Sequence, residues 1–218
     1  STVWRAKKEQ AGGAPLDAGV HNADMMLYLL GGADTVFAEI AINEKQRTLR
    51  PMSEVAPGLA AMYSHRKEDG YSTGDKVEQT AADTAFGVIK FKSGAIGQLL
   101  MTDTSHGQSL GVTTISGSTG TMYRPRSRSG ESPRIVRGDG SVVTGDELLD
   151  LVPDWELDDI TSILWDGARR ISSYEMEFKA IDSKILAYEY LDMVQAAETG
   201  GQPEVGPKEG MDALGLAY

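Results

Sequence analysis

The chain has 218 residues, of which 40% are hydrophobic and 24% charged, a composition typical of a globular protein with a hydrophobic core. Its formal net charge of -11 argues against binding to DNA or RNA, because these polyanions repel an acidic surface. The chain contains no cysteine, which excludes disulfides, thiolate metal sites and cysteine nucleophiles.

The sequence contains neither a signal-peptide pattern nor an apolar run of the ~18 residues that a membrane span needs. We therefore expect a cytoplasmic protein with no membrane partner. The chain opens on "STVWRAKKEQ", without a methionine, and stops at "GMDALGLAY", inside a helical pattern. These two features lead us to expect a chain trimmed at both ends.

The first half of the chain begins with a helical pattern. Residues 15–30 predict a helix, because Pro15 suits a first turn and a glycine pair follows Leu30. The alternation in "TVFAEIAIN", residues 35–43, predicts a strand. Residues 44–80 are polar and interrupted by proline and glycine, so we expect an insertion with one short helix around "VAPGLAAMY".

The clearest strand signal lies in residues 84–104, where two alternating runs are separated by "KSG". This pattern predicts a β-hairpin. Residues 111–123 predict two short strands joined by a glycine turn. Residues 124–145 are basic and rich in serine and glycine, and we expect them to form a long exposed hairpin loop.

The last part of the chain is expected to be helical. Short helices are expected in "DELLDLV" and "DDITSILWDGARRI", and one long amphipathic helix from residue 178 to a stop at Gly200. Hairpins flanked by helices favour an α+β fold with a mainly antiparallel sheet covered on one face. We expect one domain over residues 1–218, with insertions at about 44–80 and 124–177.

A nucleotide-binding loop is not expected in this chain. The nearest glycine-rich stretch, "SGSTGT", lies between two short predicted strands and lacks the helix that would follow a phosphate-binding loop. No strand followed by G-x-G-x-x-G occurs.

The helix predicted over residues 15–30 has one polar face. At about 100° per residue, Asp17, His21, Asp24 and Tyr28 lie on the same side of it. The spacing of four residues lets the Asp17 carboxylate reach the His21 imidazole, which would raise its pKa and suit it to exchange protons near neutral pH.

Two other interpretations of this face remain open. In one, Asp17 interacts only with the helix dipole, while His21 and Asp24 are solvated. In the other, Asp17, His21 and Asp24 bind a metal ion, although no second cluster of ligands supports them, and our prediction is that the chain holds no metal.

Other polar residues give weaker signals. His65 belongs to the charged insertion, and His106 follows the second hairpin strand, where it could reach a cleft or remain in a loop. Trp4 and Arg5 could stack on a ligand and bind an anion, or simply pack and carry a surface charge. The basic run "YRPRSRS" could bind phosphate, but a solvated loop is the simpler interpretation.

Several segments together resemble a known family. "WR" and "AGGAPLDAGVHNADMMLYLLGG" are similar to the segment that opens the substrate domain of the Gfo/Idh/MocA family, which includes glucose-fructose oxidoreductase and inositol dehydrogenase. "DTAFGVIKFKSGAIGQLLMT" resembles the sheet hairpin of that family, "ISGSTGTMY" the turn after it, and the residues from "EYLDMVQ" onward its closing helices. The resemblance covers most of residues 1–48, 82–123 and 178–218.

The resemblance implies a substrate domain of the glyceraldehyde-3-phosphate-dehydrogenase-like type, from an NAD- or NADP-dependent dehydrogenase that oxidises a hydroxyl of a sugar, polyol or related carbohydrate. It also implies that the His21 counterpart takes the hydroxyl proton while hydride goes to the nicotinamide. Asp17 would orient the substrate or the histidine. The substrate contacts implied or expected are Asp24, Trp4, Arg5, Lys7 and His106.

The dinucleotide-binding domain of the family, with its Glu-Lys-Pro motif, is missing from this sequence, so the residues that bind the cofactor remain unknown. We therefore expect the isolated chain to be inactive. An open sheet face also predicts a homo-oligomer, a dimer or a tetramer. The alternative function is a non-enzymatic module of the same fold that binds carbohydrate or mediates assembly.

Overall fold

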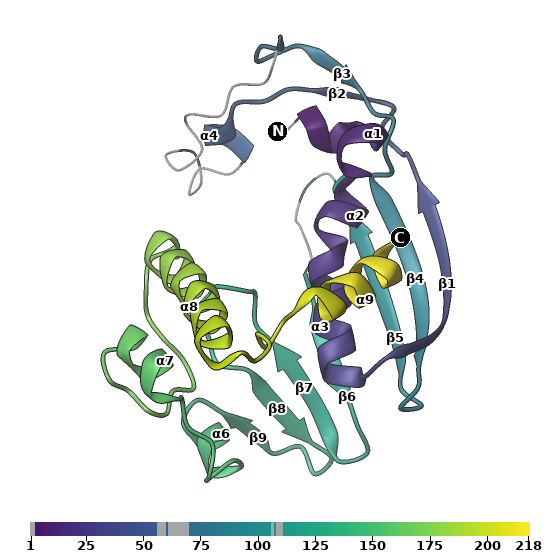
Figure 1. Ribbon diagram of the computed structural model, residues 1–218. Helices are drawn as coiled ribbons and strands as arrows, with labels where there is room; N and C mark the ends of the chain where they lie inside the picture. Colours follow the sequence, from purple (N-terminus) through teal and green to yellow (C-terminus); the bar gives the residue numbers. More distant parts are fainter. Residues whose placement is uncertain (1–2, 56–59, 61–69, 106, 108–110) are drawn as a thin grey trace. The chain divides into compact units, whose positions relative to one another are not determined.

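The computed structural model describes residues 3–55, 60, 70–105, 107 and 111–218 (Figure 1). It divides into two compact units, of which unit 1 comprises Ser1–Gln108 with Val205–Tyr218, and unit 2 comprises Ser109–Glu204. Each unit has its own antiparallel sheet and its own helices.

The main sheet of unit 1 is antiparallel, in the order β1-β4-β5. Its strands are β1 (Ala33–Ala41), β4 (Thr84–Phe91) and β5 (Ile96–Thr102). The strand predicted over residues 35–43 and the hairpin predicted over residues 84–104 are confirmed. The hairpin turn contains Gly94 at φ +89°, a backbone conformation that glycine adopts without strain.

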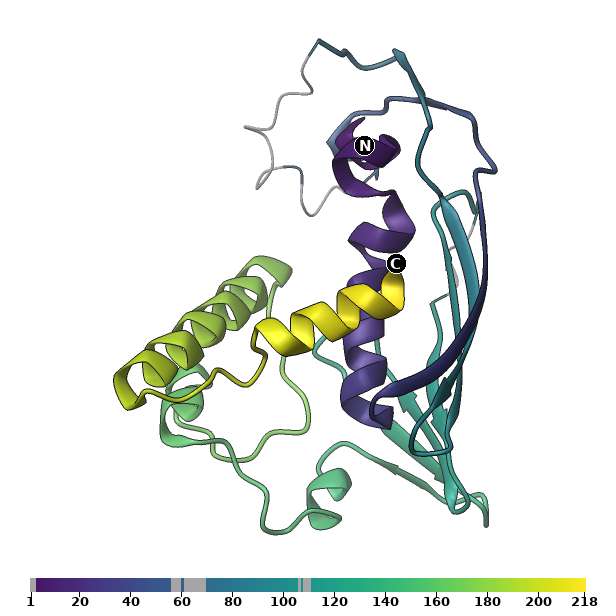
Figure 2. The same cartoon turned by 45° about the vertical axis from the view of Figure 1, so that its right-hand side comes forward.

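Helices cover one face of this sheet. The helices that contact the sheet are α2 (Ala14–Asp17) and α3 (Gly19–Leu30), and α9 (Pro207–Ala217) packs on α3. The short helices η1 (Val3–Ala6) and α1 (Lys8–Ala11) precede them in the chain. Figures 1 and 2 show α3 along the sheet and α9 crossing α3 on the same side. Helix α3 comes close to β5 at Gly97, where a Cβ atom would lie 2.4 Å from Cε of Met26 and 2.9 Å from Cε2 of Phe91, so these side chains would have to shift.

The helix predicted over residues 15–30 is confirmed, but it is divided at Ala18 into α2 and α3. The α3 helix ends before Gly31, which has φ +86°. The side of α3 that faces the protein buries Ala23 completely. Buried Ile89 and Phe91 on β4, with 2% and 1% of their surface exposed, form the inner face of the sheet.

The insertion predicted over residues 44–80 contains a two-stranded ribbon that the sequence did not predict. It consists of β2 (Gln46–Thr48) and β3 (Lys76–Glu78), with α4 (Met52–Val55) between them. Val77 and Leu49 pack with Ala6 in a small core. The helix expected around "VAPGLAAMY" falls largely outside the described residues.

Unit 2 has a four-stranded antiparallel sheet in the order β6-β7-β8-β9. Its elements are β6 (Thr113–Ser116), β7 (Gly120–Arg124), β8 (Arg134–Arg137), β9 (Val142–Thr144), α6 (Glu147–Asp150), α7 (Asp159–Leu164) and α8 (Phe178–Thr199). The strands and turn predicted over residues 111–123 are confirmed, as is the long helix α8 that ends at Gly200.

The expectation of a long hairpin loop over residues 124–145 is wrong, because two paired strands, β8 and β9, lie within this range. The N–H of Arg137 donates to the carbonyl of Ser141 at 2.8 Å and closes the turn. Serine and arginine at the ends of these short strands hide the alternation in the sequence. The fold class itself is the predicted one, with mainly antiparallel, open-faced sheets and helices.

Candidate active site

The N-terminal helices of unit 1 are held in place by the extended segment 78–83. The carbonyl of Ala6 accepts the N–H of Thr80 at 2.9 Å and that of Ala81 at 3.1 Å. Gly13 forms a parallel bridge with Ala82. A Cβ at Gly13 would lie 2.1 Å from the carbonyl oxygen of Ala82, and its φ is +95°, so this position requires glycine.

Four of the predicted site residues lie on these helices or, for Lys7, between two of them. Nε of Arg5 lies 2.6 Å from Oδ2 of Asp17, and this ion pair joins η1 to the end of α2. The Arg5 guanidinium also lies 5.1 Å from the centroid of the ring of Trp4, a residue that is 37% exposed. Lys7 donates from Nζ to the carbonyl of Glu78 at 3.0 Å. The structure therefore brings an indole, a guanidinium and a carboxylate together.

His21 lies exposed on α3 and Asp24 is half-buried on the same helix. Among the residues that the structure describes, no hydrogen bond or ion pair links His21 to Asp17, whose carboxylate contacts Arg5 instead. Tyr28, 72% exposed, continues this face of the helix. His106 lies outside the described residues.

The metal interpretation finds no support in the geometry. Within the described part of the chain, no group of three histidine, aspartate or glutamate side chains is arranged to hold a metal ion. In the same ranges, no helix has both the length and the apolar character needed to cross a membrane.

The sequence profile described as "Oxidoreductase family, C-terminal alpha/beta domain", of the Gfo/Idh/MocA type, matches residues 1–217. This chain belongs to the Gfo/Idh/MocA oxidoreductase family. No curated protein sequence matches it.

Three solved structures show how far the similarity of this Gfo/Idh/MocA chain extends. Levoglucosan dehydrogenase in complex with NADH and levoglucosan is 19% identical, with a TM-score of 0.64 over 100% of this chain and 50% of that one. An NAD binding oxidoreductase from Klebsiella pneumoniae is 19% identical, with a TM-score of 0.62 over 98% and 49%. An oxidoreductase domain protein from Kribbella flavida is 18% identical, with a TM-score of 0.61 over 98% and 48%. At such identities the likeness establishes the fold alone, and the chain spans about half the length of these proteins.

Proposed function

We propose that the chain is the substrate-binding and catalytic half of an NAD(P)-dependent oxidoreductase that acts on a hydroxyl of a sugar, polyol or related carbohydrate. Family membership supports the reaction class. The observation that carries the assignment of the site is the Arg5–Asp17 ion pair, which lies just before α3 and its exposed His21. The prediction of one substrate-binding domain over residues 1–218 belongs to this proposal.

The residues of the site suit a polyhydroxylated ligand. A carboxylate accepts hydrogen bonds from hydroxyls and a guanidinium donates to their oxygens, so Asp17 and Arg5 can bind neighbouring hydroxyls of one sugar. The exposed ring of Trp4 offers an apolar surface to the C–H groups of the same ligand. Lys7, Asp24 and His106 complete the proposed set of substrate contacts.

His21 is the proposed general base. Imidazole changes protonation between about pH 5 and 8, so it can take a hydroxyl proton near neutral pH. Asp17 acts in this scheme through the substrate, because its carboxylate is paired with Arg5. Loss of the hydroxyl proton prepares the carbon for oxidation.

The described residues do not themselves fit a dinucleotide. The glycine turn between β6 and β7 joins two antiparallel strands, and no helix follows it to present N–H groups to a pyrophosphate. A nicotinamide cofactor, when bound, would supply the hydride acceptor, and a separate domain would hold it. We propose that the isolated chain is inactive for this reason.

The test uses the full-length protein that contains this chain and its dinucleotide-binding domain, with a panel of sugars and polyols as substrates. We expect His21→Asn to reduce kcat by about 100-fold or more, the scale of general-base catalysis, while the Kd of NAD(P)H stays unchanged. His65→Asn replaces a histidine to which the proposal gives no role, and as the matched control it should keep kcat. Equal losses of kcat and cofactor affinity for His21→Asn would contradict the assignment.

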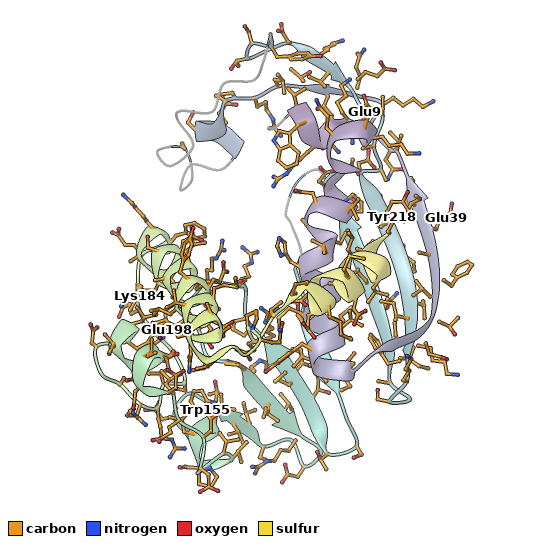
Figure 3. All side chains as sticks on the ribbon, viewed as in Figure 1. Glu9, Glu39, Trp155, Lys184, Glu198 and Tyr218 are labelled. Carbon is orange, nitrogen blue, oxygen red and sulfur yellow. The ribbon has the colours of Figure 1, made fainter. Side chains whose placement is uncertain are left out.

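The alternative of an assembly module draws support from the uncovered face of the unit 1 sheet. In the register of the strands, Phe37 lies opposite Val88, and Phe86 lies opposite both Glu39 and Leu100. Figure 3 shows Glu39 on the side of β1 away from the helices. The exposed apolar side chains on this face are Phe37 (75%), Phe86 (42%), Val88 (41%), Ile96 (75%) and Leu100 (60%). One-sided antiparallel sheets normally place polar residues there.

We propose that a second copy of the chain covers this face. Its twelve outward positions in the three-strand register include only Glu39 and Lys90 as charged residues, one of each sign, in a chain of net charge -11. Two copies can therefore bring this face together without strong charge repulsion. Three strands of about eight residues cover only ~400 Å², compared with ~800 Å² per partner in a standard interface, so we expect weak association.

Sedimentation velocity over a range of protein concentrations tests this pairing. We expect reversible dimers that Ile96→Lys and Phe37→Lys abolish. Val112→Lys replaces an equally exposed apolar residue (77%) of unit 2 and should leave the dimer intact. A chain that stays monomeric at every concentration, or dimers that survive both lysines, would refute pairing through this face.

A further inference from the structure

Asp83 is a fully buried carboxylate that the proposed chemistry does not use. It lies immediately before β4, with 0% of its surface exposed. Burial of a charged carboxylate is costly unless its oxygens are hydrogen-bonded. Here the two oxygens accept the N–H of Asn43 at 3.0 and 2.9 Å, the N–H of Glu44 at 2.9 Å and the hydroxyl of Thr84 at 3.1 Å.

Arg47 on β2 connects Asp83 to two further carboxylates. Its Nη2 lies 3.7 Å from Oδ2 of Asp83, and its guanidinium forms a two-point ion pair with Asp103, at 2.6 Å from Nη1. Nε lies 3.5 Å from Glu44. The hydrogen bonds that Arg47 donates to the Asp103 carboxylate raise the pKa of Arg47 above its ordinary value, so the guanidinium stays charged. Asp83 is thereby fixed to the connection between β1 and β2, through the backbone of Asn43 and Glu44 and the side chain of Arg47.

The same segment that ends at Asp83 carries the N-terminal helices. Besides the bonds to Ala6 and Gly13, the N–H of Lys8 donates to the hydroxyl of Thr80 at 3.0 Å. Lys7 reaches the carbonyl of Glu78. The backbone that follows Arg5, at Ala6 and Lys8, is thus hydrogen-bonded to residues 78–83. Gly13, just before the helix that ends at Asp17, is paired with the same segment.

We propose that Asp83 is a positioning residue for the Arg5–Asp17 pair. Its carboxylate fixes segment 78–83 to the backbone of Asn43 and Glu44, and that segment sets the separation between η1 and α2. The consequence for a carbohydrate rests on the proposed function. The positioning itself is a property of this chain and can be measured without any activity.

The replacement Asp83→Asn tests the idea with little change of shape. It places an NH₂ group where the carboxylate accepted N–H donors, so donors face each other and at least one bond is lost. The readout is the Nε–H signal of Arg5 in ¹H–¹⁵N spectra of the chain, identified by its loss in Arg5→Lys. Asp17→Asn provides the reference position of the unpaired signal.

In Asp83→Asn we expect the Arg5 signal to move toward that reference and its exchange with water to become about fivefold faster, while the Nε–H signal of Arg169 in unit 2 stays in place. Gly13→Ala, which breaks the bridge to Ala82, should move the Arg5 signal in the same direction. Asp34→Asn, which removes an exposed carboxylate on β1, is the control and should leave it unchanged.

A folded Asp83→Asn protein with the native Arg5 signal would overturn the proposal. If that variant does not fold, hydrogen exchange of the unaltered chain decides. The proposal requires the amides of Asn43 and Thr80 to open together with Nε–H of Arg5, and independent opening would overturn it. Because none of these measurements involves substrate turnover, their failure is distinct from failure of the proposed function.

Discussion

Arg5 and Asp17 form an ion pair that closes the N-terminal helices around the glycine pair at residues 12 and 13. The Arg5 side chain is 49% exposed and that of Asp17 is 20% exposed, with 2.6 Å between the charged atoms. An exposed pair of this kind contributes little to stability, because water screens the charges and two flexible side chains must be ordered. We therefore expect the pair to matter mainly for binding a ligand at the surface.

The first prediction concerns this pair. In a double-mutant cycle with Arg5→Gln and Asp17→Asn, we expect a coupling of no more than ~1 kcal/mol in the free energy of unfolding. In the full-length protein, each single variant should raise the KM for the sugar or polyol substrate. The same variant should change the free energy of unfolding only slightly. Urea unfolding and steady-state kinetics measure the two effects. A much larger coupling in stability would mean that the pair is mainly structural.

The second prediction concerns close packing in unit 2. Gly120 lies on β7, where a Cβ would be 2.4 Å from the carbonyl oxygen of Val136. Because the obstacle is backbone, we expect Gly120→Ala to cost about 1–3 kcal/mol of unfolding free energy. Gly210→Ala, in α9 with no atom within 4 Å of the added Cβ, should instead stabilise by about 0.5–1 kcal/mol. Urea unfolding of both variants checks that the two changes in unfolding free energy have opposite signs.

These features differ in how far the sequence predicts them. The β4–β5 hairpin and α8 follow from local patterns, alternation around "KSG" and apolar spacing ended by Gly200, and both are confirmed. The β2–β3 ribbon could not be predicted, because each strand has three residues and only its central side chain is not exposed, which leaves no detectable period. Helix α8 forms where it was expected, but the apolar pattern does not predict burial at every position, since Val194 on α8 is 52% exposed.

Local sequence patterns also fail to predict how the site residues pair. Helical geometry places Asp17 and His21 within reach of each other, but it contains no information about η1, which lies twelve residues before Asp17 and supplies Arg5. The carboxylate therefore pairs across the fold instead of along the helix. The sequence does not single out Asp83, because an aspartate before a strand is an ordinary turn residue, and only the folded chain reveals its burial.

The third prediction concerns the start of α7. Oδ1 of Asp158 accepts the N–H of Ile160 and Thr161 at 2.9 and 2.8 Å, and Oδ2 accepts the Thr161 hydroxyl at 2.6 Å. The Thr161 hydroxyl, and then the backbone N–H groups, lower the pKa of Asp158 below 3.8. The stabilisation is thus present above that value and is lost as pH falls through the lower pKa of the folded state.

We expect Asp158→Ala to cost about 1 kcal/mol of unfolding free energy at neutral pH, the usual value of a helix N-cap, and progressively less in acid. Urea unfolding as a function of pH measures this difference. Asp154→Ala, an exposed aspartate of the same connection, is the matched control and should show no such dependence. An equal loss of unfolding free energy at neutral pH and in acid would contradict the role of the charged carboxylate.

The last prediction concerns how stability depends on pH in alkaline solution, through a tyrosine near the end of unit 2. The hydroxyl of Tyr188 on α8 donates to Oε2 of Glu204 at 3.1 Å. Burial, and then the negative charge of Glu204, raise the pKa of Tyr188 above 10.0. The unfolded chain therefore loses this proton first, so the contribution to stability is complete below 10.0 and is lost as pH rises through the folded value.

We expect the free energy of unfolding to fall more steeply above pH 10.0 in the unaltered chain than in Tyr188→Phe, which cannot ionise at this position. Tyr218→Phe removes a tyrosine that is 98% exposed and should keep the steep dependence. Glu204→Gln should give an intermediate slope, because burial remains after the charge is removed. Urea unfolding at several alkaline pH values separates these outcomes, and tyrosinate absorbance follows the ionisation. Identical slopes for Tyr188→Phe and the unaltered chain would refute the prediction.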